Sequence, residues 1–122
     1  MAVKINRGAY AFAKQLIADG KSVLDDRDAW SEHQPSTAQE NEFIRDHGFA
    51  AYAKWHLGID DEAKVDTKAR YKFPYGDFLA IHRCAILTIE SRAGQFKYVD
   101  IQRAAAHLHG MLEELRTGAR GD

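Results

Sequence analysis

Two short histidine motifs contain the residues of this chain best suited to chemistry. His82 and Cys84 flank an arginine, and His107 and His109 flank a leucine. Imidazole nitrogens and a thiolate sulfur are ligands that zinc prefers in proteins. If the motifs lie on neighbouring antiparallel helices joined by a turn at residues 95–96, His82 lies level with His109, and Cys84 lies level with His107. The spacing therefore suggests a metal site between two helices.

Helical geometry argues against four ligands meeting there. Residues two positions apart on a helix point about 200° apart, so at most one member of each pair faces the partner helix. His82 and His107 would then need a third ligand from elsewhere, such as His56. A buried histidine bonded to a backbone carbonyl is more common than a histidine ligand. We therefore expect no metal and no cofactor, with these three histidines as the ligands if a metal binds, and Cys84 as a small core residue.

A segment that mixes basic and aromatic residues, 68–75, is the second candidate site. Its basic side chains could follow a phosphate backbone while its rings stack on bases. Together with the residues that follow, the candidate binding residues are Lys68, Arg70, Lys72, Tyr75, His82 and Arg83. Basic residues outnumber acidic ones over 64–97, and the reverse holds over 19–62, but the whole chain has a net charge of only −1. Charge complementarity within the fold is therefore the favoured interpretation, and nucleic-acid binding through 64–97 is the alternative.

Helical periodicity predicts the elements that position these residues. Apolar stripes predict helices over 7–18, 78–92 and 99–115, with further helices over 36–47 and 49–57 and a weaker one over 61–70. Pro74 favours an extended connection over 71–76. We expect an all-α single domain over residues 1–122, with four to six helices and a C-terminal antiparallel helix hairpin. Trp30, in a loop over 21–35, and Trp55 are expected to be buried and structural.

Composition narrows the class of protein. The chain has 122 residues, of which 45% are hydrophobic and 29% charged, as is typical of one globular domain. No apolar run approaches the roughly 20 residues of a membrane span, and no N-terminal signal segment is recognisable. A single cysteine excludes an internal disulfide framework. We expect a cytoplasmic protein that does not associate with membranes.

Five segments resemble a small bacterial domain family of uncharacterised function. The segments are Asp28–Ser31, Tyr52–Asp60, Thr67–Gly76, Ile81–Gln95 and Ala104–Leu108. Similar segments occur in stand-alone bacterial proteins and, more loosely, in domains appended to prophage head-maturation proteins. The resemblance covers a family-like core of about residues 28–112. It implies no reaction, ligand or cofactor, because none is assigned to the family.

The familiar catalytic motifs are absent from the sequence: it has no glycine-rich phosphate loop, serine elbow, paired CxxC or HExxH. We therefore expect a non-catalytic interaction or accessory module, of prophage origin according to the resemblance. Its partner would be another protein or a second copy of the chain. The alternatives are a nucleic-acid-binding protein that uses 64–97, and a metal-binding protein or metal-dependent enzyme that uses His82 and His107.

Overall fold

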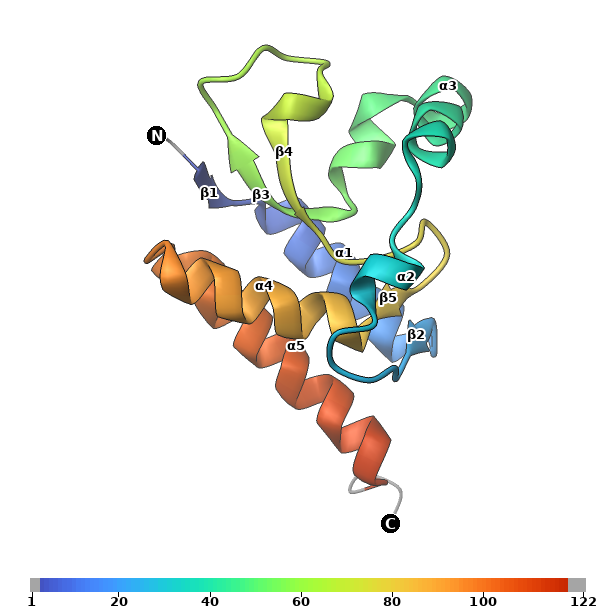
Figure 1. Ribbon diagram of the computed structural model, residues 1–122, viewed down its shortest axis with the longest axis vertical. Coiled ribbons are helices and arrows are strands. Elements are labelled where there is room, and N and C mark those ends of the chain that lie inside the picture. Colours follow the sequence, from blue (N-terminus) through green and yellow to red (C-terminus); the bar gives the residue numbers. More distant parts are fainter. Residues whose placement is uncertain (1–2, 119–122) are drawn as a thin grey trace.

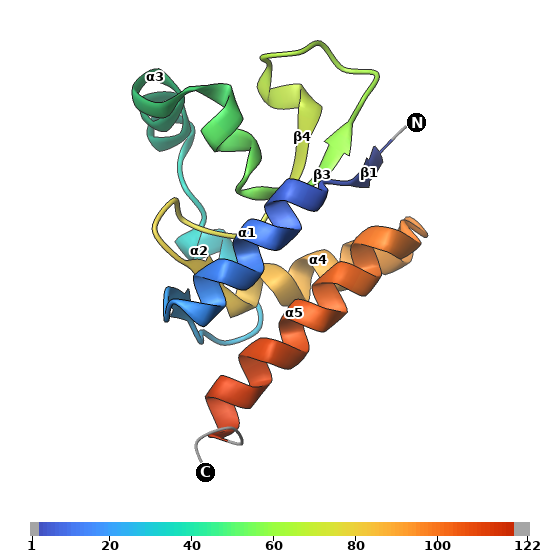
Figure 2. The ribbon, with the colours of Figure 1, turned by 180° about the vertical axis from the view of Figure 1, so that it is seen from behind.

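Residues 3–118, which are the residues that the computed structural model describes, form helices and short strands. In chain order the elements are β1 (Val3–Ile5), α1 (Arg7–Ala18), β2 (Ser22–Val23), α2 (Trp30–His33), α3 (Thr37–Ala53), β3 (His56–Asp60), the 3-10 helix η1 (Lys68–Arg70), β4 (Tyr71–Pro74), β5 (Ile81–His82), α4 (Arg83–Gln95) and α5 (Val99–Thr117). The α4–α5 hairpin lies beneath β1, β3 and β4 (Figure 1), and α1 runs between the hairpin and β3 (Figure 2). In this part of the chain, no helix combines the length and apolar character needed to cross a bilayer.

The expected all-α fold is wrong, because the chain also contains two small sheets. β3 lies between β1 and β4 in a three-stranded antiparallel sheet, with Ile5 opposite Gly58 and His56 opposite Pro74. β2 and β5 form a parallel pair. All five strands have only two to five residues, which is too short for strand alternation to be told from part of a helix. Residues 56–57, expected to end a helix, therefore begin β3 instead.

Capping chemistry sets the ends of α1 and α3 as expected. The Asn6 side chain accepts a hydrogen bond from the backbone N–H of Ala9. Ser36 and Gln39 form a complete capping box, in which each side chain bonds the other's backbone amide. Gly48 has a φ of 84° and bends α3 at the position where the sequence predicts one helix to stop and the next to begin.

α4 begins at Arg83, five residues later than predicted. Phe78 has a φ of 71°, in the left-handed region, which an α-helix cannot contain. Asp77 accepts hydrogen bonds from the backbone amides of residues 79–80 and so caps a tight turn rather than the helix. Of the weakly indicated helix over 61–70, η1 alone forms. The predicted antiparallel hairpin of α4 and α5 is present and makes the most extensive helix contact in the fold.

Both tryptophans are buried, as predicted: 9% of Trp30 and 5% of Trp55 is exposed. The Trp55 ring packs edge-on against Phe12 of α1, with 5.2 Å between ring centroids. On its other side lies Tyr75, at 5.7 Å. A Cβ atom at Gly76 would lie 2.5 Å from the Trp55 ring, so no larger residue fits there without a shift. Trp55 thus joins α1 to the chain that follows β4.

We predict that Trp30→Ala and Trp55→Ala each lower the free energy of unfolding by about 3–5 kcal/mol, because each leaves a large cavity in the core. Leu79→Ala is the matched control, since Leu79 is 78% exposed, and it should change stability by less than about 0.5 kcal/mol. Chemical denaturation followed by circular dichroism measures all three variants. Wild-type stability in either tryptophan variant would show that the ring does not support the core.

Candidate metal centre

Two short parallel strands bring distant segments of the chain together beside α4. Val23 of β2 lies opposite His82 of β5. In a parallel pair the carboxyl ends of both strands meet at one edge. Asp25, two residues after β2, therefore lies beside His82 and Cys84, at the junction of β5 and α4. His33, at the end of α2, completes the group.

The Asp25 carboxylate is the meeting point of these side chains. Its Oδ2 atom lies 2.7 Å from Nδ1 of His82 and 2.7 Å from Nδ1 of His33. The Cys84 thiol donates to the same oxygen over 3.1 Å. The four potential ligand atoms, one from each residue, all lie within 4.8 Å of one another. Two nitrogens, one oxygen and one sulfur thus converge on one point.

The centre is closed on three sides and open at His33. The side chains of Asp25 and His82 are 8% and 6% exposed, and Cys84 is fully buried. The His33 side chain is 36% exposed. A surface cavity of about 490 Å³ is lined by His33 and by Asp77, the next neighbour of His82. An ion could therefore reach the centre from solvent.

Further hydrogen bonds hold the converging groups in place. Asp77 Oδ2 lies 2.9 Å from Nε2 of His82, the ring nitrogen that faces away from Asp25. The backbone N–H of Cys84 donates to Asp25 Oδ1 over 2.7 Å. Arg83 Nη1 donates to the backbone carbonyl of Asp25 over 2.9 Å. A carboxylate behind a ligand histidine and a hydrogen bond to a ligand carboxylate are the contacts that orient metal ligands in proteins.

These contacts determine the charges of Asp25 and Cys84. Burial alone would raise the pKa of Asp25, but hydrogen bonds from His82, Cys84 and His33 outweigh it and lower that pKa to about 2. Burial, together with the hydrogen bond to Asp25, raises the pKa of the Cys84 thiol to about 12. Without a cation, Cys84 is a neutral thiol at physiological pH, unlike the low-pKa thiols of cysteine nucleophiles.

The separations of the donor atoms fit a tetrahedral cation. Bonds of about 2.0–2.3 Å to a four-coordinate zinc place its ligand atoms about 3.3–3.8 Å apart. Here Asp25 Oδ2 lies 2.7 Å from each imidazole nitrogen, Cys84 Sγ lies 4.0 Å from His33 Nδ1, and all four donor atoms lie within 4.8 Å of one another. Small side-chain adjustments would therefore turn a hydrogen-bonded cluster into a coordination shell.

The two carboxylates beside the His82 ring also favour a metal ion at Nδ1. Each ring nitrogen faces a carboxylate, Asp25 on one side and Asp77 on the other. Only the doubly protonated ring can donate to both carboxylates. A metal ion at Nδ1 would let the neutral ring satisfy both sides, since Nε2–H still donates to Asp77.

The structure does not bring together His82, His107 and His56, the three ligands considered from sequence. His107 of α5 is hydrogen-bonded with the hydroxyl of Tyr10 of α1. His56 is buried, and its Nδ1 donates to the carbonyl of Tyr52 over 2.8 Å. The remaining histidine of the two motifs, His109, pairs with Glu90 rather than lying beside His82.

Internal partners engage most of the candidate binding residues of the basic and aromatic segment. Lys68 forms an ion pair with Glu40 at 3.1 Å. Arg70 donates to the carbonyl of residue 63. Tyr75 is fully buried, and its hydroxyl donates to the carbonyl of residue 54. Arg83 forms an ion pair with Glu113 at 2.6 Å, and His82 belongs to the candidate metal centre. Of the six candidates, Lys72 alone has no partner assigned within residues 3–118.

Sequence reasoning missed Asp25 and His33, because both lie in a segment read as a turn-rich loop. The available signal was the short interval between an acidic residue and a histidine in a loop that also carries a large tryptophan. No hydrophobic period, of two residues or of 3.6, indicates in the sequence that β2 pairs with β5. This pairing is what brings His82 and Cys84 next to Asp25.

Comparison with known proteins gives no match among protein-family models, curated proteins or solved structures.

We predict that His56 makes the protein less stable in mild acid. Burial, partly offset by the hydrogen bond to Tyr52, lowers the pKa of His56 from 6.5 to about 4. Between these values the unfolded chain binds more protons at this residue than the folded chain does. Stability should therefore fall as pH decreases from 6.5 to 4, by roughly 3 kcal/mol from this group alone.

Urea unfolding at several pH values gives the free energy of unfolding as a function of pH, and the slope of that curve between pH 4 and 6.5 measures the contribution of His56. His56→Gln should lose stability less steeply than the wild type over that window. His47→Gln, at an exposed histidine of α3, is the control and should keep the wild-type slope. Parallel curves for the wild type and His56→Gln would refute the assignment.

Proposed function

We propose that this protein binds one divalent transition-metal ion, zinc in the first place, through Asp25, His33, His82 and Cys84. The observation that carries the proposal is the convergence of four donor atoms within 4.8 Å of one another. Two imidazole nitrogens, a thiolate and a carboxylate oxygen form a ligand set that suits zinc. Asp77 behind His82 supplies the supporting carboxylate that such sites commonly have.

The charges of the centre support this assignment. A divalent cation is neutralised by the carboxylate of Asp25 and the thiolate of Cys84, while both histidines bind as neutral rings. A neutral centre can be buried without the cost of an isolated charge. On binding, the ion takes the place of the thiol proton that Cys84 otherwise keeps.

The number of ligands favours a structural role over a catalytic one. Four protein ligands complete a tetrahedral shell and leave no position for water or substrate. The ion would join the segment around Asp25 to the start of α4, where His82 lies 57 residues further along the chain. This role agrees with a non-catalytic accessory or interaction module whose fold the metal stabilises.

We predict that the protein binds one equivalent of zinc and that zinc raises its melting temperature. At a free zinc concentration a thousand times the Kd, the free energy of unfolding should increase by about 4 kcal/mol. Cobalt titration should give intense visible absorption and a thiolate charge-transfer band. Cys84→Ser should remove that band and weaken binding, whereas His107→Gln should bind as the wild type does. Failure of the wild type to bind zinc, or equal binding by Cys84→Ser, would overturn the proposal.

We further predict that Asp77→Asn weakens zinc binding by about 10–100-fold, because His82 loses the acceptor for its outer N–H. The substitution keeps an oxygen to accept from the backbone amides of Leu79 and Ala80. The turn that Asp77 caps should therefore be retained. The free energy of unfolding of the metal-free variant, compared with that of the metal-free wild type, tests this directly. Competition with a chromophoric chelator measures the affinity. Wild-type zinc affinity in this variant would mean that Asp77 does not support the metal ligand.

A further inference from the structure

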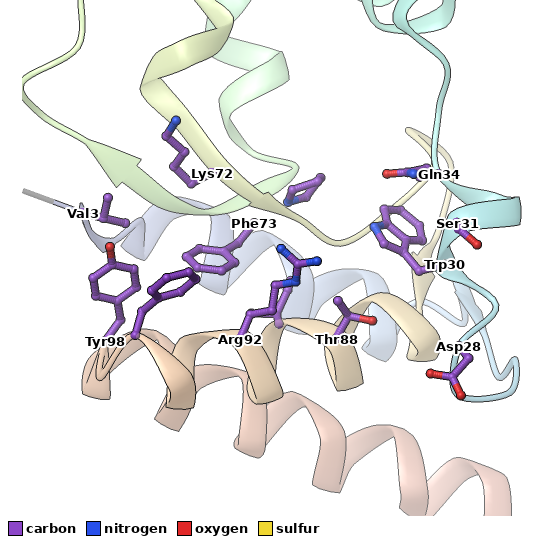
Figure 3. Close-up of a pocket in the computed structure, with 13 residues that line it drawn as sticks. Val3, Asp28, Trp30, Ser31, Gln34, Lys72, Phe73, Thr88, Arg92 and Tyr98 are labelled. Carbon is purple, nitrogen blue, oxygen red and sulfur yellow. The ribbon is translucent and has the colours of Figure 1, made fainter. Parts of the chain in front are cut away.

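A second cavity, separate from the metal ligands, lies between α2, β4 and α4. Its volume is about 640 Å³, within the range of pockets that hold small molecules. Trp30 forms its wall next to the metal centre, where the indole ring lies 5.7 Å from the His82 ring. Figure 3 shows the cavity running from Trp30 along α4 to Tyr98.

The walls of this cavity are largely flat and apolar. They are formed by Trp30, Phe73, Pro74, Ile89, Phe96 and Tyr98. The Phe96 and Tyr98 rings are nearly parallel, with an angle of 26° between them, and Phe73 meets Tyr98 edge-on. Phe96 is 57% exposed although it is a large aromatic residue. Such walls favour a planar aromatic occupant, which stacks on one ring and meets the edge of another.

Arg92 places a positive charge at the middle of the cavity. Its side chain rises from α4 between Phe73 and Trp30 (Figure 3). Within residues 3–118, no carboxylate forms an ion pair with Arg92, whereas Arg83 and Arg116 are both paired with Glu113. A guanidinium presents two parallel N–H groups that match a carboxylate. The free fork of Arg92 therefore favours an anionic group at the middle of the cavity.

The remaining polar side chains set the direction of the occupant. The indole nitrogen of Trp30 faces the cavity, and the Lys72 ammonium points away from it (Figure 3). Asp28 lies at the α2 end, away from Arg92 (Figure 3). A second negative group at that end would be repelled, so the cavity suits a molecule with a single acidic group.

We infer that this cavity binds a small planar aromatic monocarboxylate. The carboxylate lies on the guanidinium of Arg92, and the ring system lies between Phe73 and Trp30. This binding goes beyond the metal centre and uses none of its ligands.

Isothermal titration with 2-naphthoate tests the inference, with 2-naphthamide as the uncharged molecule of the same shape. The wild type should bind one 2-naphthoate, and the amide should bind about tenfold more weakly or worse, since it lacks the charge-assisted hydrogen bonds. Arg92→Gln should weaken 2-naphthoate binding by about tenfold and leave amide binding unchanged. Arg103→Gln removes an exposed arginine of α5 outside the cavity and should bind as the wild type does.

The location is checked by tryptophan fluorescence, which should change on binding because Trp30 lines the cavity. Absence of 2-naphthoate binding, equal affinity for the acid and the amide, or wild-type affinity in Arg92→Gln would each overturn the inference. Arg92 is exposed on α4, so its substitution should not prevent folding, and a circular dichroism spectrum verifies this.

Discussion

The carboxylate of Asp25 is the group on which the arrangement of this domain depends. A carboxylate with so little exposed surface is costly unless its oxygens are satisfied. Asp25 receives hydrogen bonds from two imidazoles, a thiol and a backbone amide, which belong to α2, β5 and α4. Because of these bonds, the segment between β2 and α3 has a fixed position although it contains only one helical turn.

That helical turn, α2, links the two candidate sites. A four-residue helix is not stable on its own, because helix formation needs a costly nucleus. The buried ring of Trp30 anchors its first residue, and the hydrogen bond between His33 and Asp25 anchors its last. Trp30 then forms a wall of the aromatic cavity, and His33 forms the open side of the candidate metal centre. Both candidate sites therefore require α2 to be folded.

Sequence patterns predicted the parts of the fold that are set locally. The caps of α1 and α3, the bend at Gly48 and the C-terminal hairpin follow from residue types within a few positions of one another. The strands could not be predicted in this way, because two to five residues carry no readable period and their partners are distant. Left-handed backbone at Phe73 and Phe78 was equally hidden, since bulky residues rarely adopt it. In the same way, His82 was named as a possible ligand, with Cys84 expected only as a small core residue, but pairing between distant strands places both beside Asp25 and His33.

The long interval between the two halves of the proposed metal centre bears on how the domain would fold around an ion. Ligands that lie a few residues apart, as in zinc fingers, can capture an ion while the rest of the chain is still unfolded. Here 57 residues separate Asp25 from His82, and bringing them together costs loop-closure entropy before any contact forms. Contacts between distant residues also slow folding relative to local ones. If the proposed ion binds, its capture therefore belongs to the last steps of assembly, after the hairpin and α1 have docked, and the ion would lock a nearly finished domain rather than nucleate it.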